Sequence, residues 1–259
     1  CPPSLCWGSN ASSTRHFSGA FSMSPSDVPH RYLWGAGWGC PHWLCGPLEK
    51  ELERLSKAYC QTEKERCRKQ MSGMRRAITK ENHQKWSQLT CRRLSGLLDV
   101  LGARSVGVYS AVRGEVDLAW LWSMGNTCSR VFYFPRVSDG SLTFHQVREP
   151  RKELRPGAFG IPTPLDSLAS ESPSTFDVMI LPGLAFDRFG NRIGSGAGFY
   201  DRLLGSLHIR PCLVGAGFLS QMVWEGSLPS GPYDVSMDWI STNRECVRSL
   251  SRVHKPRSS

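Results

Sequence analysis

The stretch DVMILPGLAFDRFGNRIGSGAGFYDR, residues 177–202, decides the fold because it joins three patterns in a fixed order. The segment Asp177–Leu181 contains a continuous apolar run after its first residue, which is typical of a strand buried on both faces of a sheet. Glycines then alternate at positions 194, 196 and 198, directly before a helix that we expect to start around Phe199. A buried strand, a glycine-rich turn and a helix indicate an α/β protein.

Similar patterns occur along the rest of the chain. Apolar residues recur at helical steps over 48–59 and 67–78 and again over 94–101. A short helix is expected over 118–123, after Asp117. Strands are predicted over 105–109, 131–134, 141–147, 211–215 and 238–242, the last of which we expect to close the sheet. Strands that alternate with helices predict βαβ units and a mostly parallel sheet.

Composition and charge narrow the function classes. The 259 residues are 40% hydrophobic, and no run approaches the ~20 apolar residues of a membrane-spanning helix. The formal net charge is +10, with 13 basic and 6 acidic side chains in residues 49–93. This surplus favours anionic partners, namely nucleic acid, acidic membrane, or small molecules that carry phosphate or carboxylate groups. The alternative is that the basic surface only keeps the protein soluble.

The chain divides by composition into three parts. Residues 1–47 are rich in Ser, Gly and Pro and poor in acidic side chains, which predicts a disordered or transit-like extension. Residues 48–247 form the predicted folded domain, and residues 248–259 a flexible tail. The ten cysteines include no CxxC pair, so free thiols are favoured over a disulfide scaffold or the weak Cys40-His42-Cys45 zinc pattern.

The glycine-rich turn can bind a phosphate chain. Glycine permits positive φ and close approach of backbone N–H groups, which can wrap phosphates at a helix N-terminus. Arg192 and Arg202 flank the turn with positive charge, and Asp201 offers a hard oxygen ligand for Mg²⁺. The spacing matches neither GxGxxG nor a P-loop. A tight connection with solvated arginines is an equal alternative at this point.

Two further groups of charged residues stand out. On the helix before residue 80, Lys64, Arg68 and Arg75 point within roughly 40° of one another, beside the apolar seam, where they could hold an anion at the rim of a cleft. A solvated helix edge is the alternative. Glu115 follows the strand that ends at Tyr109, where ligands bind in parallel sheets. Nearby Asp117 has a simpler role as a helix cap.

These segments, taken in order, resemble the 5-formyltetrahydrofolate cyclo-ligase family, also called methenyltetrahydrofolate synthetases. The family's usual form is P-G-x-A-F-D-x-x-G-x-R-L-G-x-G-x-G-Y-Y-D, and residues 182–202 are similar to it. The remaining matches lie over about residues 60–245, in the family's order: 64–68 with 75–78, 109–117, 159–162 and 234–242. The resemblance implies a three-layer α/β/α fold of the NagB/RpiA/CoA-transferase type.

The family's activity follows from the resemblance. Its members use Mg·ATP to convert 5-formyltetrahydrofolate into 5,10-methenyltetrahydrofolate, releasing ADP and phosphate. In the reaction proposed for them, the formyl oxygen attacks the γ-phosphate and the N10 nitrogen of the folate then closes the ring. Such a reaction needs mainly positioning and charge neutralisation. ATP and Mg²⁺ are therefore the expected cofactors, and 5-formyltetrahydrofolate, including its polyglutamylated forms, is the expected substrate.

The resemblance also assigns residues to roles. The catalytic group would be Arg192, Tyr200 and Glu115. ATP would be bound by Lys64, Arg68, Arg192, Gly194, Ser195, Gly196, Ala197, Gly198, Phe199 and Tyr200. The folate would be bound by Ser110, Glu115, Ser195, Gly196, Ala197, Gly198 and Phe199. Mg²⁺ would be bound by Asp201 and Asp238.

Two other functions stay open beside this one. A family member that has lost activity could use its basic face to bind nucleic acid or to regulate, and a different ATP-dependent ligase could use a similar sheet. We expect an active monomeric enzyme that binds neither nucleic acid nor membrane. We expect it in the cytoplasm, with the mitochondrial matrix as the alternative because of residues 1–47.

Overall fold

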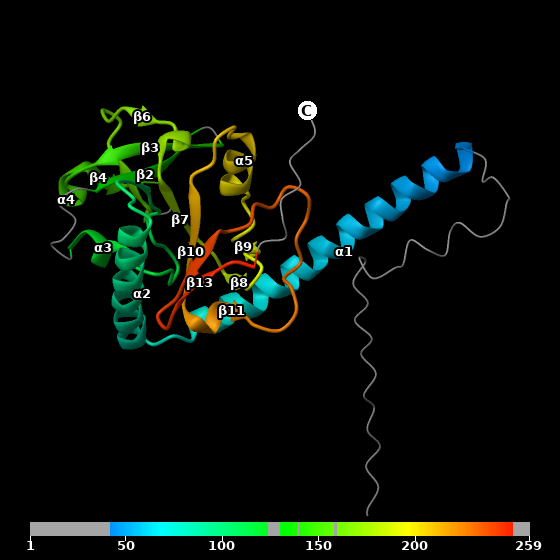
Figure 1. Cartoon of the computed structure of the whole chain (residues 1–259), viewed down its shortest axis with the longest axis horizontal. Coiled ribbons are helices and arrows are strands. Elements are labelled where there is room, and N and C mark those ends of the chain that lie inside the picture. Colours follow the sequence, from blue (N-terminus) through cyan, green and yellow to red (C-terminus); the bar gives the residue numbers. More distant parts are fainter. Residues whose placement is uncertain (1–41, 124–129, 139, 158–159, 251–259) are drawn as a thin grey trace, which may run out of the picture. The chain divides into compact units, whose positions relative to one another are not determined.

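A computed structural model describes residues 42–123, 130–138, 140–157 and 160–250 (Figure 1). The chain divides into two compact units, Cys1–Glu49 and Lys50–Ser259. The extension predicted for residues 1–47 and the tail predicted for 248–259 therefore lie mostly outside the described residues, as do the side chains of the Cys40-His42-Cys45 pattern.

Two long helices precede the sheet. Helix α1 (His42–Arg76) is continuous and begins six residues before the first periodic leucine of the sequence pattern. Its two apolar stretches differ, because Cys67 and Met71 pack in the core whereas Leu52 and Leu55 are 64% and 56% exposed. Helix α2 (Lys80–Val100) begins after Thr79, whose hydroxyl accepts a hydrogen bond from the Asn82 N–H. The periodic leucines at 94, 97 and 98 are buried, as their spacing predicts.

The central sheet has eight strands in the order β13-β12-β10-β7-β1-β2-β3-β6. The strands are β1 (Ser105–Gly107), β2 (Val131–Ser138), β3 (Ser141–Val147), β6 (Ser170–Glu171), β7 (Val178–Pro182), β10 (Cys212–Ala216), β12 (Trp239–Ser241) and β13 (Cys246–Arg248). The five strands from β12 to β2 are parallel, and the edge pairs are antiparallel. The predicted parallel sheet is confirmed, but the segment 238–242 does not close it, because β13 pairs beyond β12.

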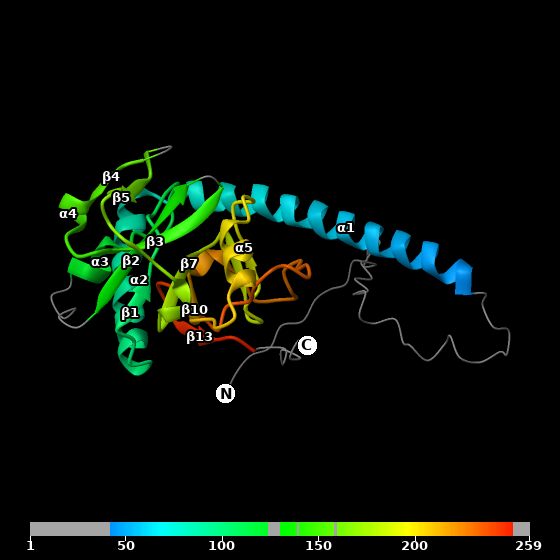
Figure 2. The same cartoon turned by 90° about the horizontal axis from the view of Figure 1, so that it is seen from above.

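The sheet is covered on both faces, which confirms the three-layer fold. In β7, Val178 and Ile180 belong to one buried cluster with α2 and with α3 (Ala119–Ser123). Met179 and Leu181, which alternate with them, belong to a second cluster with α5 (Phe199–Ser206). This alternation is the period of two that a strand imposes. Figures 1 and 2 show α2 and α5 on opposite sides of β7 and β10.

A small sheet follows β7 along the chain. Strands β8 (Ala185–Asp187) and β9 (Arg192–Ile193) form an antiparallel hairpin, and β11 (Met222–Val223) pairs with β8. The remaining elements are short: α4 (Pro150–Glu153), β4 (Leu154–Pro156), β5 (Pro162–Pro164) and the 3₁₀ turns Pro173–Thr175 and Leu219–Gln221. The β8–β9 hairpin leads directly into the glycine-rich turn.

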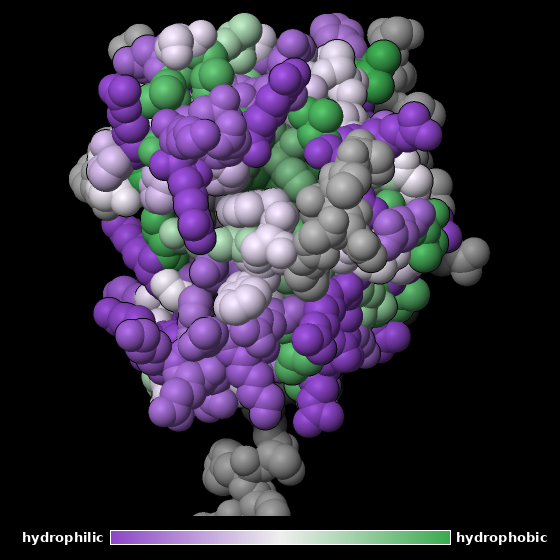
Figure 3. Space-filling view, turned by 90° about the vertical axis from the view of Figure 1, so that its left-hand side faces the viewer, coloured by the Kyte–Doolittle hydropathy of each residue, from purple (hydrophilic) through white to green (hydrophobic). Residues whose placement is uncertain are grey.

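Hydrophilic side chains cover much of the face seen in Figure 3, where hydrophobic residues appear as separate small patches. Among the described helices, none is long and apolar enough to span a bilayer.

Candidate active site

The carboxyl end of β7 is where the candidate site begins. The strand ends at Pro182, whose carbonyl accepts a hydrogen bond from Arg192 Nη1 at 3.0 Å. The next carbonyl, that of Gly183, accepts from Arg75 Nη1 at 3.3 Å and from Gln221 Nε2 at 2.8 Å. Carbonyl groups at a strand end have no partner within the sheet, so the two guanidinium groups satisfy them. Positive charge is thereby fixed at the edge where parallel sheets bind ligands.

A buried carboxylate fixes the β8–β9 hairpin and thus the position of Arg192. Asp187 is fully buried, and its Oδ1 accepts the backbone N–H groups of Phe189 and Asn191, each at 2.9 Å. Its Oδ2 accepts the Asn191 side chain at 2.8 Å and the backbone N–H of Leu228 at 2.8 Å. The carboxylate therefore ties the hairpin turn to the segment that leads to the loop around residue 233.

The glycine-rich turn has the backbone that the sequence predicts. Gly196 has φ +108° and Gly198 has φ +68°, and Gly198 is the N-cap of α5. Side chains with a Cβ rarely adopt such conformations. Arg68 from α1 donates from Nε to the carbonyl of Gly194 at 3.1 Å, and Arg202 donates to the carbonyl of Ala197 at 2.8 Å. Two cationic groups thus hold the turn, with residues 195–197 exposed to solvent.

Arg192 and Asp201 form the central ion pair of the site. Arg192 Nη2 contacts both carboxylate oxygens of Asp201 at 3.0 Å, and the Arg192 side chain is only 4% exposed. The Arg192 Nε has no hydrogen-bond partner within the described part of the chain. Asp201 also accepts the Val235 N–H at 3.4 Å. The first turn of α5 is therefore joined to the loop 231–235.

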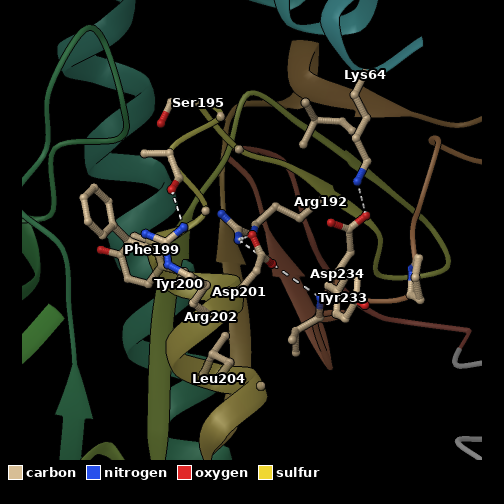
Figure 4. A pocket seen from close by; sticks show the side chains of 18 of the residues that line it. Lys64, Arg192, Ser195, Phe199, Tyr200, Asp201, Arg202, Leu204, Tyr233 and Asp234 are labelled. Carbon is tan, nitrogen blue, oxygen red and sulfur yellow. Dashed lines mark hydrogen bonds and ion pairs between the residues drawn. The ribbon is translucent and has the colours of Figure 1, made fainter. Parts of the chain in front are cut away.

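A second ion pair crosses the site from α1. Lys64 Nζ contacts Asp234 Oδ2, and both side chains are largely buried. The same carboxylate oxygen accepts the Gly231 N–H at 2.7 Å, so the loop is closed on itself as well as on α1. Figure 4 shows Lys64 and Asp234 pointing toward one another, near Arg192 and Asp201.

These groups line one cavity of about 1040 Å³. Its walls are α1, the glycine-rich turn, one face of α5 and the loop 232–235. Every residue that the sequence assigns to ATP lines it: Lys64, Arg68, Arg192, Gly194, Ser195, Gly196, Ala197, Gly198, Phe199 and Tyr200. Asp201 lines it as well. Ser110, Glu115 and Asp238 are not among the lining residues.

Glu115 lies beneath the cavity instead. Its side chain accepts the Val112 N–H at 3.1 Å and lies 3.8 Å from Arg75. Burial raises the pKa of Glu115, although the Val112 N–H and Arg75 oppose the shift. Burial also raises the pKa of Tyr200, and the nearby charge of Glu115 adds to that shift. Tyr200 lines the cavity, and Glu115 is thus close to one of its lining residues.

The other sequence assignments have structural partners of their own. Ser110 donates to the carbonyl of Pro162 at 2.5 Å. Asp117 accepts the Ala119 N–H at 2.9 Å and thus caps α3 as predicted. Asp238 accepts from Arg210 at 3.0 Å and from the Leu213 N–H at 2.7 Å, which joins the start of β12 to β10. The described residues contain no cluster of three or more His, Cys, Asp or Glu side chains that could hold a metal ion by itself.

Among the lining residues that sequence reasoning did not select, four have charged, amide or aromatic side chains: Gln61, Arg210, Tyr233 and Asp234. Asp234 lies in the C-terminal segment of the resemblance, so its carboxylate was a visible signal. Gln61 lies one helical turn before Lys64 and could have been found by extending the cationic stripe. Tyr233 and Arg210 carry no sequence signal, because the fold alone brings their segments to the cavity.

Comparison with known proteins agrees with this geometry. The model of the 5-formyltetrahydrofolate cyclo-ligase family matches residues 60–243. The 5-formyltetrahydrofolate cyclo-ligase of Escherichia coli (strain K12) is 32% identical over 174 residues, which are 65% of this chain and 93% of that protein. A mitochondrial 5-formyltetrahydrofolate cyclo-ligase of Arabidopsis thaliana is 39% identical over 85 residues, 30% of each chain.

A solved structure is similar along most of its length. The Aquifex aeolicus 5,10-methenyltetrahydrofolate synthetase has a TM-score of 0.63 and 28% identity, covering 76% of this chain and 95% of that one. The family match spans more than half of the chain and includes the glycine-rich turn, both ion pairs and α5. The chain therefore belongs to the 5-formyltetrahydrofolate cyclo-ligase family.

Proposed function

We propose that this protein uses Mg·ATP to convert 5-formyltetrahydrofolate into 5,10-methenyltetrahydrofolate, with release of ADP and phosphate. The observation that carries the proposal is the cavity, in which a glycine-rich turn at a helix N-terminus faces three cationic side chains, Lys64, Arg68 and Arg192. Phosphoryl transfer needs positioning and charge neutralisation more than covalent help from the protein. The same cavity supplies both.

The phosphate chain of ATP fits the polar end of the cavity. Backbone N–H groups of the turn and the N-terminus of α5 favour negative charge there. Arg68 and Lys64 approach from α1, one helical turn apart, and Arg192 approaches from β9. Arg192 is rigid because Pro182 and Asp201 hold its guanidinium group. We propose that it neutralises charge developing on the transferred phosphoryl group.

Carboxylates of the same cavity suit Mg²⁺. Asp201 and Asp234 both line it, and the contact of Asp201 with the Val235 N–H places the two carboxylates on adjoining segments. Carboxylate oxygens are the ligands that Mg²⁺ prefers, usually one or two of them with phosphate oxygens and water. We therefore propose Asp201 with Asp234 rather than Asp238 as the pair that holds Mg²⁺, because Asp238 is used at the base of β10 and β12. The ion would neutralise phosphate charge.

The folate is proposed to lie beside the glycine-rich turn, over Tyr200. Glu115 and Ser110 follow β1, at the same edge of the sheet, and Glu115 is close enough to raise the pKa of Tyr200. A protonated tyrosine can donate a hydrogen bond to an oxygen of the reacting groups. In the proposed reaction the formyl oxygen attacks the γ-phosphate, ADP leaves, and the folate N10 attacks the activated carbon as phosphate departs.

The proposal is tested with purified protein, 5-formyltetrahydrofolate and Mg·ATP, by following the near-ultraviolet absorbance of the methenyl product. We expect an ATP-dependent rise that Asp201→Ala abolishes. The matched control is Asp166→Ala, which removes a fully exposed carboxylate outside the cavity and leaves the rate unchanged. A folded wild-type protein without turnover would contradict the proposal. Salt-sensitive binding of nucleic acid in its place would favour the inactive, regulatory alternative.

The compartment is a separate proposal. We propose a cytoplasmic enzyme, with the mitochondrial matrix as the alternative that a mitochondrial relative and the composition of residues 1–47 support. Fluorescence microscopy of the full chain, compared with a chain lacking residues 1–47, distinguishes the two. Mitochondrial signal that disappears on truncation would contradict the cytoplasmic assignment.

A further inference from the structure

The cavity has a second end whose chemistry differs from that of the phosphate end. Away from the glycine-rich turn, the lining has five apolar or aromatic side chains beside the polar Gln61, Ser206, Arg210 and Asp234: Leu204, Leu207, Pro232, Tyr233 and Val235. Leu207 and Val235 pack on the core cluster beneath α5, so this wall is firm. The loop 231–235 forms part of this end, and the Val235 N–H joins it to Asp201 in the first turn of α5. The apolar end therefore suits a flat base.

Tyr233 is the aromatic side chain of that end. It is 79% exposed and lines the cavity, so its ring is accessible to a ligand that enters there. Its backbone is held on both sides, since Asp234 contacts Lys64 and Gly231 and the Val235 N–H contacts Asp201. Figure 4 shows Tyr233 next to Asp234, on the side of the cavity opposite Phe199. A ring on a fixed loop loses little conformational entropy when a base stacks on it.

Gln61 adds a hydrogen-bonding group to the same end. It lines the cavity from α1, one turn before Lys64, and its side chain is exposed and without a hydrogen-bond partner among the described residues. A carboxamide both donates and accepts, and glutamine pairs with the edge of adenine in this way. Guanine keeps the N7 acceptor but has the O6 acceptor in place of the N6 donor, so the oxygen of the carboxamide has no donor to pair with.

We propose that Tyr233 stacks on the adenine ring of ATP and that Gln61 reads the edge of that ring. The inference rests on the proposed function and extends it to base specificity. With the phosphates at the glycine-rich turn and the base at Tyr233, the nucleotide extends past the first turn of α5 to the loop 231–235, and the γ-phosphate lies toward Tyr200.

Steady-state kinetics test the stacking. Tyr233→Ala is expected to raise the KM for ATP about tenfold, within the range for loss of one base–aromatic stack. The kcat and the KM for 5-formyltetrahydrofolate should stay within twofold, and Tyr233→Phe should restore the wild-type KM for ATP. The matched control is Tyr59→Ala, which removes an exposed tyrosine ring on α1 that does not line the cavity. Gln61→Ala should lower the ratio of kcat/KM for ATP to kcat/KM for GTP at least threefold.

Direct binding separates this inference from the proposed function. Isothermal titration with Mg·ATP and with Mg·triphosphate, without folate, measures nucleotide affinity whether or not the protein turns over. We expect Tyr233→Ala to weaken ATP binding and to leave triphosphate binding unchanged, because triphosphate has no base. Equal loss for both ligands, or no loss for either, would overturn the inference. Tight ATP binding without cyclisation would instead contradict the proposed function and leave the stacking supported.

Discussion

Replacing Asp187 by Asn tests how strongly one buried carboxylate holds the site. Its Oδ1 accepts the Phe189 and Asn191 N–H groups. Its Oδ2 accepts the Leu228 N–H and the Asn191 side chain, and the Ser227 hydroxyl, which can rotate away, at 3.3 Å. An amide has only one acceptor oxygen, so either orientation of Asn leaves two donors facing an NH₂ group. Each buried unsatisfied donor costs about 1–3 kcal/mol.

With two such donors, we therefore expect Asp187→Asn to lower the free energy of unfolding by about 2–6 kcal/mol. For a chain of this size, that corresponds to a decrease in Tm on the order of 10 °C. Urea denaturation followed by circular dichroism measures the free energy, and a thermal melt measures Tm. Asp166→Asn is the matched control, since its exposed carboxylate contributes little. A change below 1 kcal/mol for Asp187→Asn would refute the assignment of the carboxylate as the support of the hairpin.

Three further predictions follow from the site. Gly198→Ala places a Cβ at φ +68° and 3.0 Å from the Arg202 side chain. We expect the free energy of unfolding, measured by urea denaturation, to fall by about 1–2 kcal/mol. We also expect a higher KM for ATP in the cyclisation assay. Because burial raises the pKa of Glu115 above its ordinary 4.5, its contribution to stability is complete below pH 4.5 and is lost as pH rises through the raised value. Glu115→Gln should flatten that decline in unfolding free energy above pH 4.5, and an unchanged slope would contradict it. Burial also raises the pKa of Tyr109 and Tyr200, so Tyr109→Phe and Tyr200→Phe should leave the tyrosinate absorbance up to pH 11 as in the wild type, whereas a reduced amplitude would show that these rings ionise.

The sequence predicts those parts of the fold that local patterns determine. A continuous apolar run such as 178–181 requires burial on both faces, and alternating glycines before a helix require positive φ, so the parallel sheet and the turn could be predicted. Helical periodicity also predicted a helix over 48–59, but it reports only that apolar residues share a face. Leu52 and Leu55 share one, and they are exposed within the described part of the chain.

The partners of the charged residues could not be predicted in this way. Lys64 and Asp234 are 170 positions apart, and no local pattern shows that a loop near the C-terminus meets the second half of α1. The choice between Asp234 and Asp238 depends on whether each lies in the loop or at the start of β12, a difference that follows from the register of the sheet. Sequence could name the carboxylates but not their neighbours.

The pairing of cationic side chains with acceptors of the protein itself has a consequence for nucleotide affinity. Lys64 contacts Asp234, Arg68 contacts the Gly194 carbonyl and Arg192 contacts Asp201, so an incoming polyanion exchanges one set of partners for another. The net free energy of binding is then the energy of the new contacts with the polyanion minus that of the protein contacts they replace. It is therefore smaller than three cations without protein partners would give. In the proposed reaction, this exchange of partners would lower the affinity for ADP and so favour its release.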